Sequence, residues 1–333
     1  MTYTSGSLIQ ATDYNGFVST TVGANVNATW GSAFYGQPDL ATVAATNTVT
    51  ATQWASLVNT VTSMAAHQPT TITARTAPTA GTTISILAAV NTDITNCYTN
   101  RFNATAVGTQ FTGWTGTNSK TTQTGTSGGA AWTITFTNTV TWASLGAAQY
   151  FFNAGGLIKI QVNKNAVGLT GDPAWNNLAS TLCGDIYISG LATAHTIAGV
   201  SYTGVTARSN GTNNTGTPTT LATTQGWDGL VAGAAGTIVY KQFSATAPYT
   251  TDFIQHTIAK NAGSTTLTIT TLWSANDTNT PPVGGTDPIS GGTATSGTTF
   301  GTAPATLVTY FPPESTNLTT IAWGTPTVAA TTV

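Results

Sequence analysis

The side chains that could carry out acid–base chemistry in this chain are nine aspartates, one glutamate and three histidines. A glycosidase needs two carboxylates that flank a sugar, but these carboxylates are scattered. Several occupy positions typical of helix caps and turns, namely Asp13, Asp172 and Asp277. A Ser-His-Asp hydrolase could use His195 or His256, yet no Gly-x-Ser-x-Gly sequence stands before a predicted helix. We therefore predict no catalytic residues and a protein that is not an enzyme.

Metal and cofactor sites have equally weak signals. The run 276–279 (NDTN) is similar to a calcium-binding loop but lacks its glycine and its final glutamate. His67 stands at the end of a predicted helix without a second ligand nearby, so we expect its imidazole to meet the last helical carbonyls. Cys97 and Cys183 show no metal or redox spacing, which favours two buried thiols over a disulfide. No glycine-rich phosphate loop is present, and we predict no metal site and no cofactor.

Aromatic side chains in polar stretches offer another kind of site. Exposed aromatics among Asn and Thr can stack on sugars, but large aromatics also dominate protein cores and subunit interfaces. Six aromatics stand in or beside such stretches: Trp114, Trp227, Trp273, Trp323, Tyr249 and Tyr310. We favour burial in a core or an interface for them, with sugar binding as the alternative.

The chain is poor in charge. Only 5% of its 333 residues are charged, against about 25% in typical soluble proteins. The net charge of −2 and the lack of any basic stripe argue against nucleic acid as a partner, and a net charge near zero favours association. With so few ions available, we expect Arg101 to be a fixed structural ion, paired with Asp93 or the main chain, or placed at an oligomer contact.

Helical signals concentrate in the first third of the chain. Apolar residues at helical spacing predict helices over 51–66 and 83–102. A Thr-x-x-Gln capping box over 50–53 precedes the first of them. A further short helix could be capped by Thr12 or Asp13.

Most of the remaining chain has the pattern of strands. Trp132, Ile134 and Phe136 alternate with threonines, a β-branched residue that favours strands. The segment 113–129 has almost no apolar residues and is predicted as a loop or hairpin tip, and a short helix is predicted over 171–184. Further strands are predicted over 185–189, 196–206, 237–243, 252–260 and 265–273, with polar loops at 210–220 and 276–302 and a C-terminal arm on a neighbour at 325–333.

The most informative stretch is 142–162 (WASLGAAQYFFNAGGLIKIQV). Three aromatics at 150–152 lead into Asn-Ala-Gly-Gly at 153–156, and 157–162 then alternates between apolar and polar residues. An aromatic anchor, a Gly-Gly turn and an alternating strand predict a rigid core hairpin or the start of a strand. None of these residue types suggests chemistry, so we interpret the stretch as scaffold.

The FFNAGG sequence in this stretch resembles a segment of structural proteins in tailed-bacteriophage virions, particularly those of marine and cyanobacterial phages. Other motifs of the same kind occur in the expected order: IQATDYN (9–15), WG (30–31), YGQ (35–37), TATQWASLVN (50–59), HQ (67–68) and NRF (100–102). The similarity covers the first half of the chain, to about Val162, and the remainder shows no familiar pattern. The resemblance implies a component of the virus particle without specifying which one.

We therefore expect a mainly β fold with an N-terminal helical section. Residues 1–165 would form an α+β assembly module, and residues 166–333 a strand-rich module resembling a β-sandwich or jelly-roll. The resemblance implies a non-enzymatic structural component of a tailed-phage virion, first of all a homo-oligomeric tail protein such as a fibre, baseplate or other appendage. The alternatives are a capsid decoration or cement protein, and a carbohydrate-binding or carbohydrate-cleaving receptor module.

The expected partners follow from the same interpretation. They are further copies of the chain, with a trimer favoured, other virion proteins and, for the receptor alternative, host surface polysaccharide. The first residues lack a basic region and a long apolar run, so we expect no secretory signal and no membrane span. The protein would be made in the host cytoplasm and would reach the particle, first of all its tail, by assembly.

Overall fold

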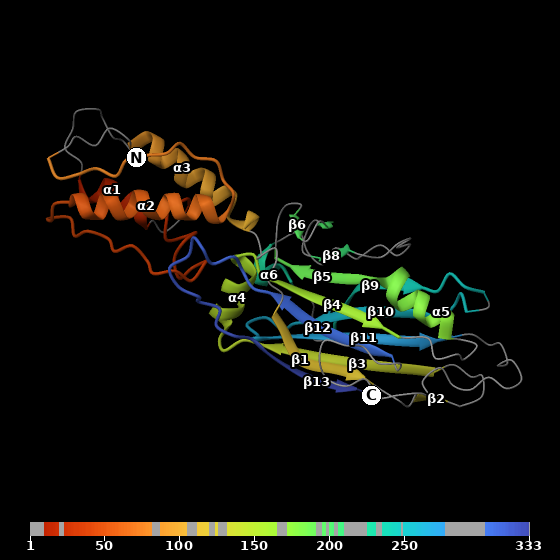
Figure 1. The fold of residues 1–333 in the computed structure, drawn as a ribbon. Helices are drawn as coiled ribbons and strands as arrows, with labels where there is room; N and C mark the ends of the chain where they lie inside the picture. Colours follow the sequence, from red (N-terminus) through yellow and green to blue (C-terminus); the bar gives the residue numbers. More distant parts are fainter. Residues whose placement is uncertain are drawn as a thin grey trace, which may run out of the picture.

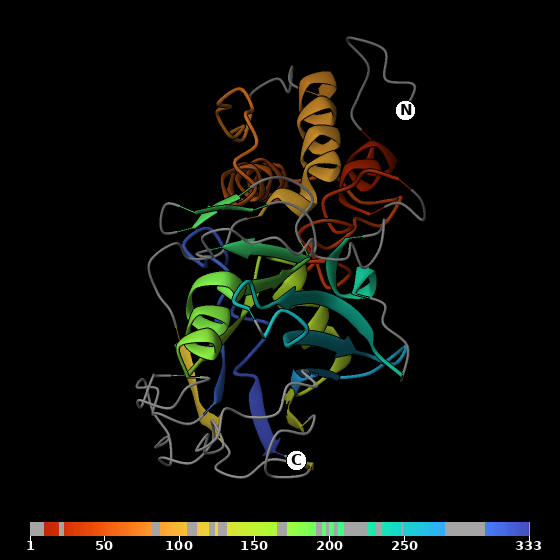
Figure 2. The same ribbon diagram turned by 90° about the vertical axis from the view of Figure 1, so that its right-hand side faces the viewer.

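The computed structural model combines helices near the N-terminus with two large antiparallel sheets, and it confirms the predicted fold class. Figures 1 and 2 show the helical section α1–α3 projecting beyond one end of the sheets. The described residues are 10–19, 23–81, 87–104, 112–119, 124–125, 132–164, 172–190, 195–197, 200–202, 206–209, 225–230, 235–247, 249–276 and 304–332.

The helical section consists of α1 (Ala11–Val18), α2 (Ala51–His67), α3 (Leu87–Thr99) and the short η1 (Arg101–Asn103). The predicted capping box of α2 is confirmed, because Gln53 N donates to Thr50 Oγ1 and Thr50 N donates to Gln53 Oε1. The predicted cap of α1 is wrong. Gln10 is its N-cap, and Asp13 accepts a hydrogen bond from Gln10 N (2.9 Å).

The first sheet has the strand order β1-β12-β4-β5-β8 and the second the order β13-β3-β11-β10-β9, with β2 paired to β3. A separate ladder joins β6 to β7. The helices between and beside the strands are α4 (Leu145–Asn153), α5 (Asp172–Asn176), the π-helical η2 (Asn177–Cys183) and α6 (Gly226–Gly229). The strands are β1 (Thr112–Ser119), β2 (Thr124–Gly125), β3 (Trp132–Thr141), β4 (Leu157–Asn163), β5 (Asp185–Ser189), β6 (His195–Ile197), β7 (Val200–Tyr202), β8 (Thr206–Ser209), β9 (Thr237–Phe243), β10 (Phe253–Ala259), β11 (Thr266–Ala275), β12 (Ala305–Phe311) and β13 (Thr327–Thr332).

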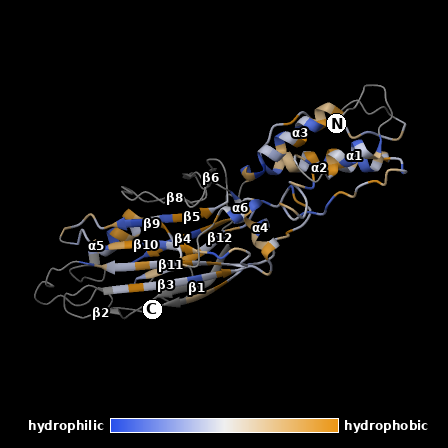
Figure 3. Cartoon of the chain, turned by 180° about the vertical axis from the view of Figure 1, so that it is seen from behind, coloured by the Kyte–Doolittle hydropathy of each residue, from blue (hydrophilic) through white to orange (hydrophobic). Residues whose placement is uncertain are grey.

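Alternation along β3 and β11 gives the second sheet an apolar inner face and a threonine-rich outer face. The inner face buries Ile134 and Phe136 on β3, and Ile269 and Trp273 on β11. Figure 3 shows this alternation as orange positions between paler ones. The buried apolar residues of the helical section and the sheets form one continuous cluster, so the helices pack onto the same core as the sandwich.

Several expectations about local structure are wrong. The aromatic run at 150–152 lies in helix α4, because these side chains pack into the core from a helix, and only Leu157 onward is strand. The segment 113–129 contains β1 and β2, and β1 gains its partners from distant β12. The predicted strand over 196–206 is divided among β6, β7 and β8.

The C-terminal end is also not an arm on a neighbour. Thr327–Thr332 form β13, which pairs with β3 of the same chain. Strands on both sides of residue 165 share both sheets, because β3 pairs with β11 and β4 pairs with β12. The predicted loop at 210–220 lies outside the described residues, as does 276–302 beyond Asn276.

Candidate functional site

Most of the sequence motifs of the first half meet where the helical section joins the sheets. We call this place the junction and define it by five segments: 30–37, 67–68, 100–102, 150–156 and 314–323. They come from the loop after α1, the end of α2, η1, the end of α4 and the segment between β12 and β13. These segments are far apart in sequence, and the contacts described below bring them together.

Tyr35 and Arg101 form the centre of the junction. The Tyr35 hydroxyl donates to the main-chain oxygen of Arg101 (2.5 Å), and burial raises the pKa of Tyr35 well above its usual value. The Arg101 guanidinium donates to Tyr98 O (2.5 Å) and lies over the rings of Tyr98 (4.1 Å) and Phe102 (4.9 Å). Arg101 is therefore held by the main chain, one of the alternatives expected from the sequence, and by aromatic faces. Asp93 pairs with Arg75 instead.

Gln37 fastens the C-terminal segment to this centre. Its side-chain oxygen accepts from Thr319 N (2.8 Å) and Thr320 N (2.9 Å), and its amide donates to Thr320 O (3.0 Å). The neighbouring Gly36 has φ +72°, and a Cβ there would lie 2.5 Å from the Tyr150 ring. The Tyr-Gly-Gln motif therefore allows close packing at Gly36 and binds the C-terminal segment through Gln37.

The FFNAGG residues approach the same segment from α4. Tyr150 donates its hydroxyl hydrogen to Ser32 O (2.8 Å), and the Asn153 amide donates to Phe34 O (3.2 Å). On its other side, α4 contributes to an aromatic cluster in which the Phe152 ring stacks on Trp227 (5.5 Å). These contacts confirm a scaffold role for the aromatics, although they act from a helix.

Lys260 holds the short helix α6 against this aromatic cluster. Its ammonium donates to Trp227 O (2.8 Å) and lies 4.5 Å from the centre of a Trp227 ring. Burial lowers the pKa of Lys260, and the nearby Asp228 opposes that shift. The lysine therefore serves as a cationic anchor for the helix.

His67 is the most unusual polar group of the junction. It is 2% exposed, and neither ring nitrogen has a hydrogen-bond partner among the described residues. The ring packs edge-to-face on Tyr35 (4.9 Å), and the backbone of Ala154 lies near it but outside hydrogen-bonding geometry. Burial lowers the pKa of His67 to about 4, partly opposed by Ala154 and by the charge of Glu314. The expected contact with the last helical carbonyls is therefore not made.

His256 and Cys183 form a second polar group, inside the sandwich. His256 Nδ1 lies 3.0 Å from Thr271 Oγ1, and its Nε2 lies 3.6 Å from Cys183 Sγ. Both His256 and Cys183 are fully buried, and burial lowers the pKa of His256 to about 3. A thiol beside an imidazole can act as a nucleophile only where a substrate can reach it, so we interpret this pair as a hydrogen-bonded core contact.

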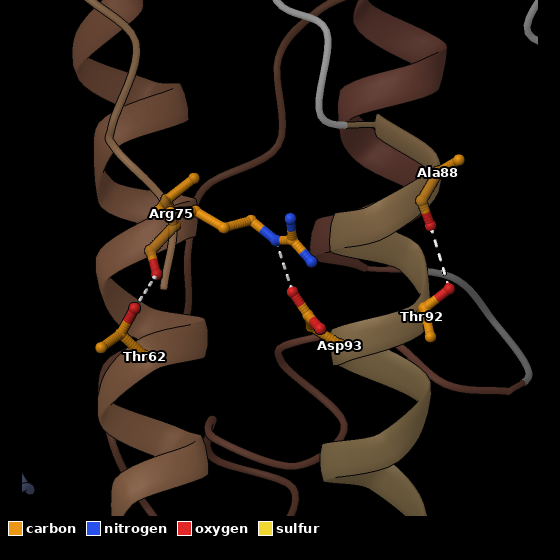
Figure 4. Close-up of polar contacts among 6 residues, drawn as sticks. Thr62, Arg75, Ala88, Thr92 and Asp93 are labelled. Atoms are coloured by element: carbon orange, nitrogen blue, oxygen red, sulfur yellow. Dashed lines mark hydrogen bonds and ion pairs between the residues drawn. The ribbon is translucent and has the colours of Figure 1, made fainter. Parts of the chain in front are cut away.

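A small hollow lies between α2 and α3. Figure 4 shows the Arg75–Asp93 ion pair, whose residues line it. Arg75 Nε donates to Asp93 Oδ2 (2.6 Å) above an apolar floor that includes Val58, Val61 and Val90. The solvent-reachable space is about 10 Å³, which is about the room that one water molecule needs. The ion pair therefore fastens the segment after α2 to α3, and the hollow is too small for a ligand.

Among the described residues, those considered for chemistry from the sequence do not converge on one place. Asp13 belongs to a capping box, Asp172 begins α5, and Asp277 lies outside the described residues. Across the described ranges, no group of three or more His, Cys, Asp or Glu could hold a metal ion. The two cysteines are buried and form no disulfide, as predicted.

Four of the six aromatics considered for sugar binding are inside the protein, whereas Tyr249 is partly exposed. Burial is confirmed for four of them: Trp227, Trp273, Trp323 and Tyr310. Trp114 has no described side-chain environment. Sugar binding by Trp227 or Trp273 would require the core to open.

Comparisons with known proteins found no match. No family model, no curated protein and no solved structure matches it. In the part of the chain that the structure describes, no helix is long and apolar enough to cross a membrane. The resemblance to phage virion proteins stays a prediction that rests on the motifs.

Proposed function

We propose that this protein is a non-enzymatic structural component of a tailed-phage virion, working as a homo-oligomer in a tail appendage such as a fibre or baseplate. The motifs behind the resemblance lie mostly in the junction, where they fasten helices to sheets. A structural role for the motif residues fits a component of a virus particle, because such a component works by keeping a fixed shape.

The main structural support for an oligomer is the outer face of the second sheet. Threonines stand opposite each other in three neighbouring cross-strand pairs: Thr141 with Thr266, Thr139 with Thr268, and Thr137 with Thr270. On the outward positions of β3, β11 and β10 no side chain is charged, and on β9 the outward cation Lys241 lies over the Phe253 ring (3.6 Å). Such a face can be buried against another subunit without desolvating unpaired ions.

The test is the solution mass of the purified 33.9 kDa chain by light scattering, followed by negative-stain imaging. We expect a trimer or a higher oligomer. Because few ions take part, we expect the mass to be the same in low and moderate salt. Dissociation of the oligomer by moderate salt would contradict the charge-free contact, and a monomer at every concentration would contradict the proposal.

A pair of substitutions tests the face itself. Thr139→Lys together with Thr268→Lys places like charges opposite each other on the outer face, and should convert the oligomer to smaller species. Thr52→Lys, on the exposed side of α2, is the matched control and should leave the mass unchanged. If both variants keep the wild-type mass, another surface makes the contact.

Labelling of intact particles would then separate the tail from the capsid. Antibodies against the chain that bind along the tail would support an appendage. Binding over the capsid facets would favour the decoration or cement alternative. Binding of host polysaccharide by the monomeric protein would favour the receptor alternative.

A further inference from the structure

His67 is buried, and three other segments of the junction act on its ring through Tyr35, Ala154 and Glu314. Among the described residues its two nitrogens have no hydrogen-bond partner, and its ring contacts Tyr35. A neutral imidazole has one donor, whereas the protonated ring has two and carries a full charge. Protonation inside the closed junction would therefore bury a charge with unsatisfied donors.

The titratable and charged groups around the ring give it little compensation. Glu314, from the segment after β12, is the anion that acts on His67. Tyr35 faces the ring, and Arg101 of η1 and Cys97 of α3 act electrostatically on Tyr35. Neither α2 nor α4 contains a charged residue. The backbone of Ala154 and the carboxylate of Glu314, which is partly buried, are therefore the two groups that favour a charged His67.

The segments that cover His67 are held mainly by side chains. Gln37 binds the segment around Thr319 and Thr320, and Tyr150 binds Ser32. These bonds can break without unpairing any strand of the two sheets. His256, by contrast, lies between β9 and β11 on the inner face of a sheet, so only opening of the sandwich exposes it.

We propose that His67 is an acid-sensitive latch, so that its protonation opens the junction while the two sheets stay paired. The helical section is then released from the end of the sandwich in acid. This device is independent of whether the chain belongs to a virus particle.

The direction follows from proton linkage. The closed junction holds the pKa of His67 at about 4, whereas an opened junction returns it to about 6.5. Between these values the opened state binds more protons, so opening becomes more favourable as the pH falls. The opening equilibrium should rise by up to about tenfold per pH unit, or about 300-fold across the window.

Hydrogen–deuterium exchange of the full-length chain between pH 7.5 and 4.5, corrected for intrinsic exchange rates, measures this opening. We expect segments 30–40, 64–70 and 312–326 to lose protection as the pH falls, while β10 and β11 keep theirs. Equal protection of the junction at both pH values would overturn the proposal. If β10 and β11 lost protection together with the junction segments, the proposal would also be overturned, because the response would then be global unfolding.

Two variants assign the response to the ring. His67→Phe keeps an aromatic contact with Tyr35 but cannot take up a proton, and should make junction protection independent of pH across the window. His67→Gln serves the same purpose if the phenylalanine variant folds poorly. Wild-type acid sensitivity in a folded variant would place the switch elsewhere.

Discussion

Replacing Gln37 with alanine should loosen the C-terminal segment from the junction and destabilise the protein. The side chain makes three good hydrogen bonds to the backbone of Thr319 and Thr320, at 2.8, 2.9 and 3.0 Å. Each such bond contributes about 0.5–1.5 kcal/mol net, and a buried group left without a partner costs more. Gln37 is 1% exposed, so water cannot easily replace it. We expect a loss of about 2–4 kcal/mol in the free energy of unfolding.

Urea denaturation followed by tryptophan fluorescence measures this loss, and Trp323 lies in the segment that should be released. Gln149→Ala is the matched control, because Gln149 is partly exposed and makes a single long hydrogen bond to Asp228 (3.3 Å). It should change stability by less than about 0.5 kcal/mol. If both variants lose equally little, the hydrogen bonds of Gln37 do not hold the segment and our account of the junction is wrong.

Two further predictions concern the core and the helical section. Arg75→Met should destabilise the chain by about 1–3 kcal/mol, because it leaves the Asp93 carboxylate, 7% exposed, without its ion partner. In urea denaturation, a double variant that adds Asp93→Leu should recover most of this loss of stability. If the double variant recovers none of it, the explanation is refuted. Cys97 and Cys183 should react with a thiol reagent far more slowly in the native protein than in denaturant. Both thiols are buried, and burial raises the pKa of Cys97 to about 12. Rapid labelling of the native protein would contradict the structure.

Local signals predicted the elements that depend on neighbours in sequence. The capping box and apolar spacing identified α2 within one residue at its end, because a helix satisfies its hydrogen bonds within its own segment. Alternation likewise gave β5 and β9 with the observed bounds and β10 and β11 to within two residues. The outer face of the second sheet could also be read from this alternation.

Elements that depend on distant partners differ from what the local sequence predicts. The aromatic run of α4 carries the composition of a strand, yet it is helical because Phe151 and Phe152 pack against Trp142 in the core. β1 has few apolar residues and is a strand because β12 offers it a ladder. The contact of Gln37 with Thr320 spans 283 residues, and no spacing rule reaches that far.

The sequence by itself determined a charge-poor, β-rich chain with an N-terminal helical section, because composition and periodicity act locally and are read directly. It also indicated that the stretch around FFNAGG is scaffold. Only the tertiary structure decided that the FFNAGG and Tyr-Gly-Gln motifs meet in one junction and that Trp227 and Trp273 are core residues. It also decided that His67 is enclosed without a hydrogen-bond partner among the described residues. Burial and hydrogen bonding depend on segments brought together by folding, and the same imidazole would be an ordinary solvated base if Tyr35 and the segment around Glu314 lay elsewhere.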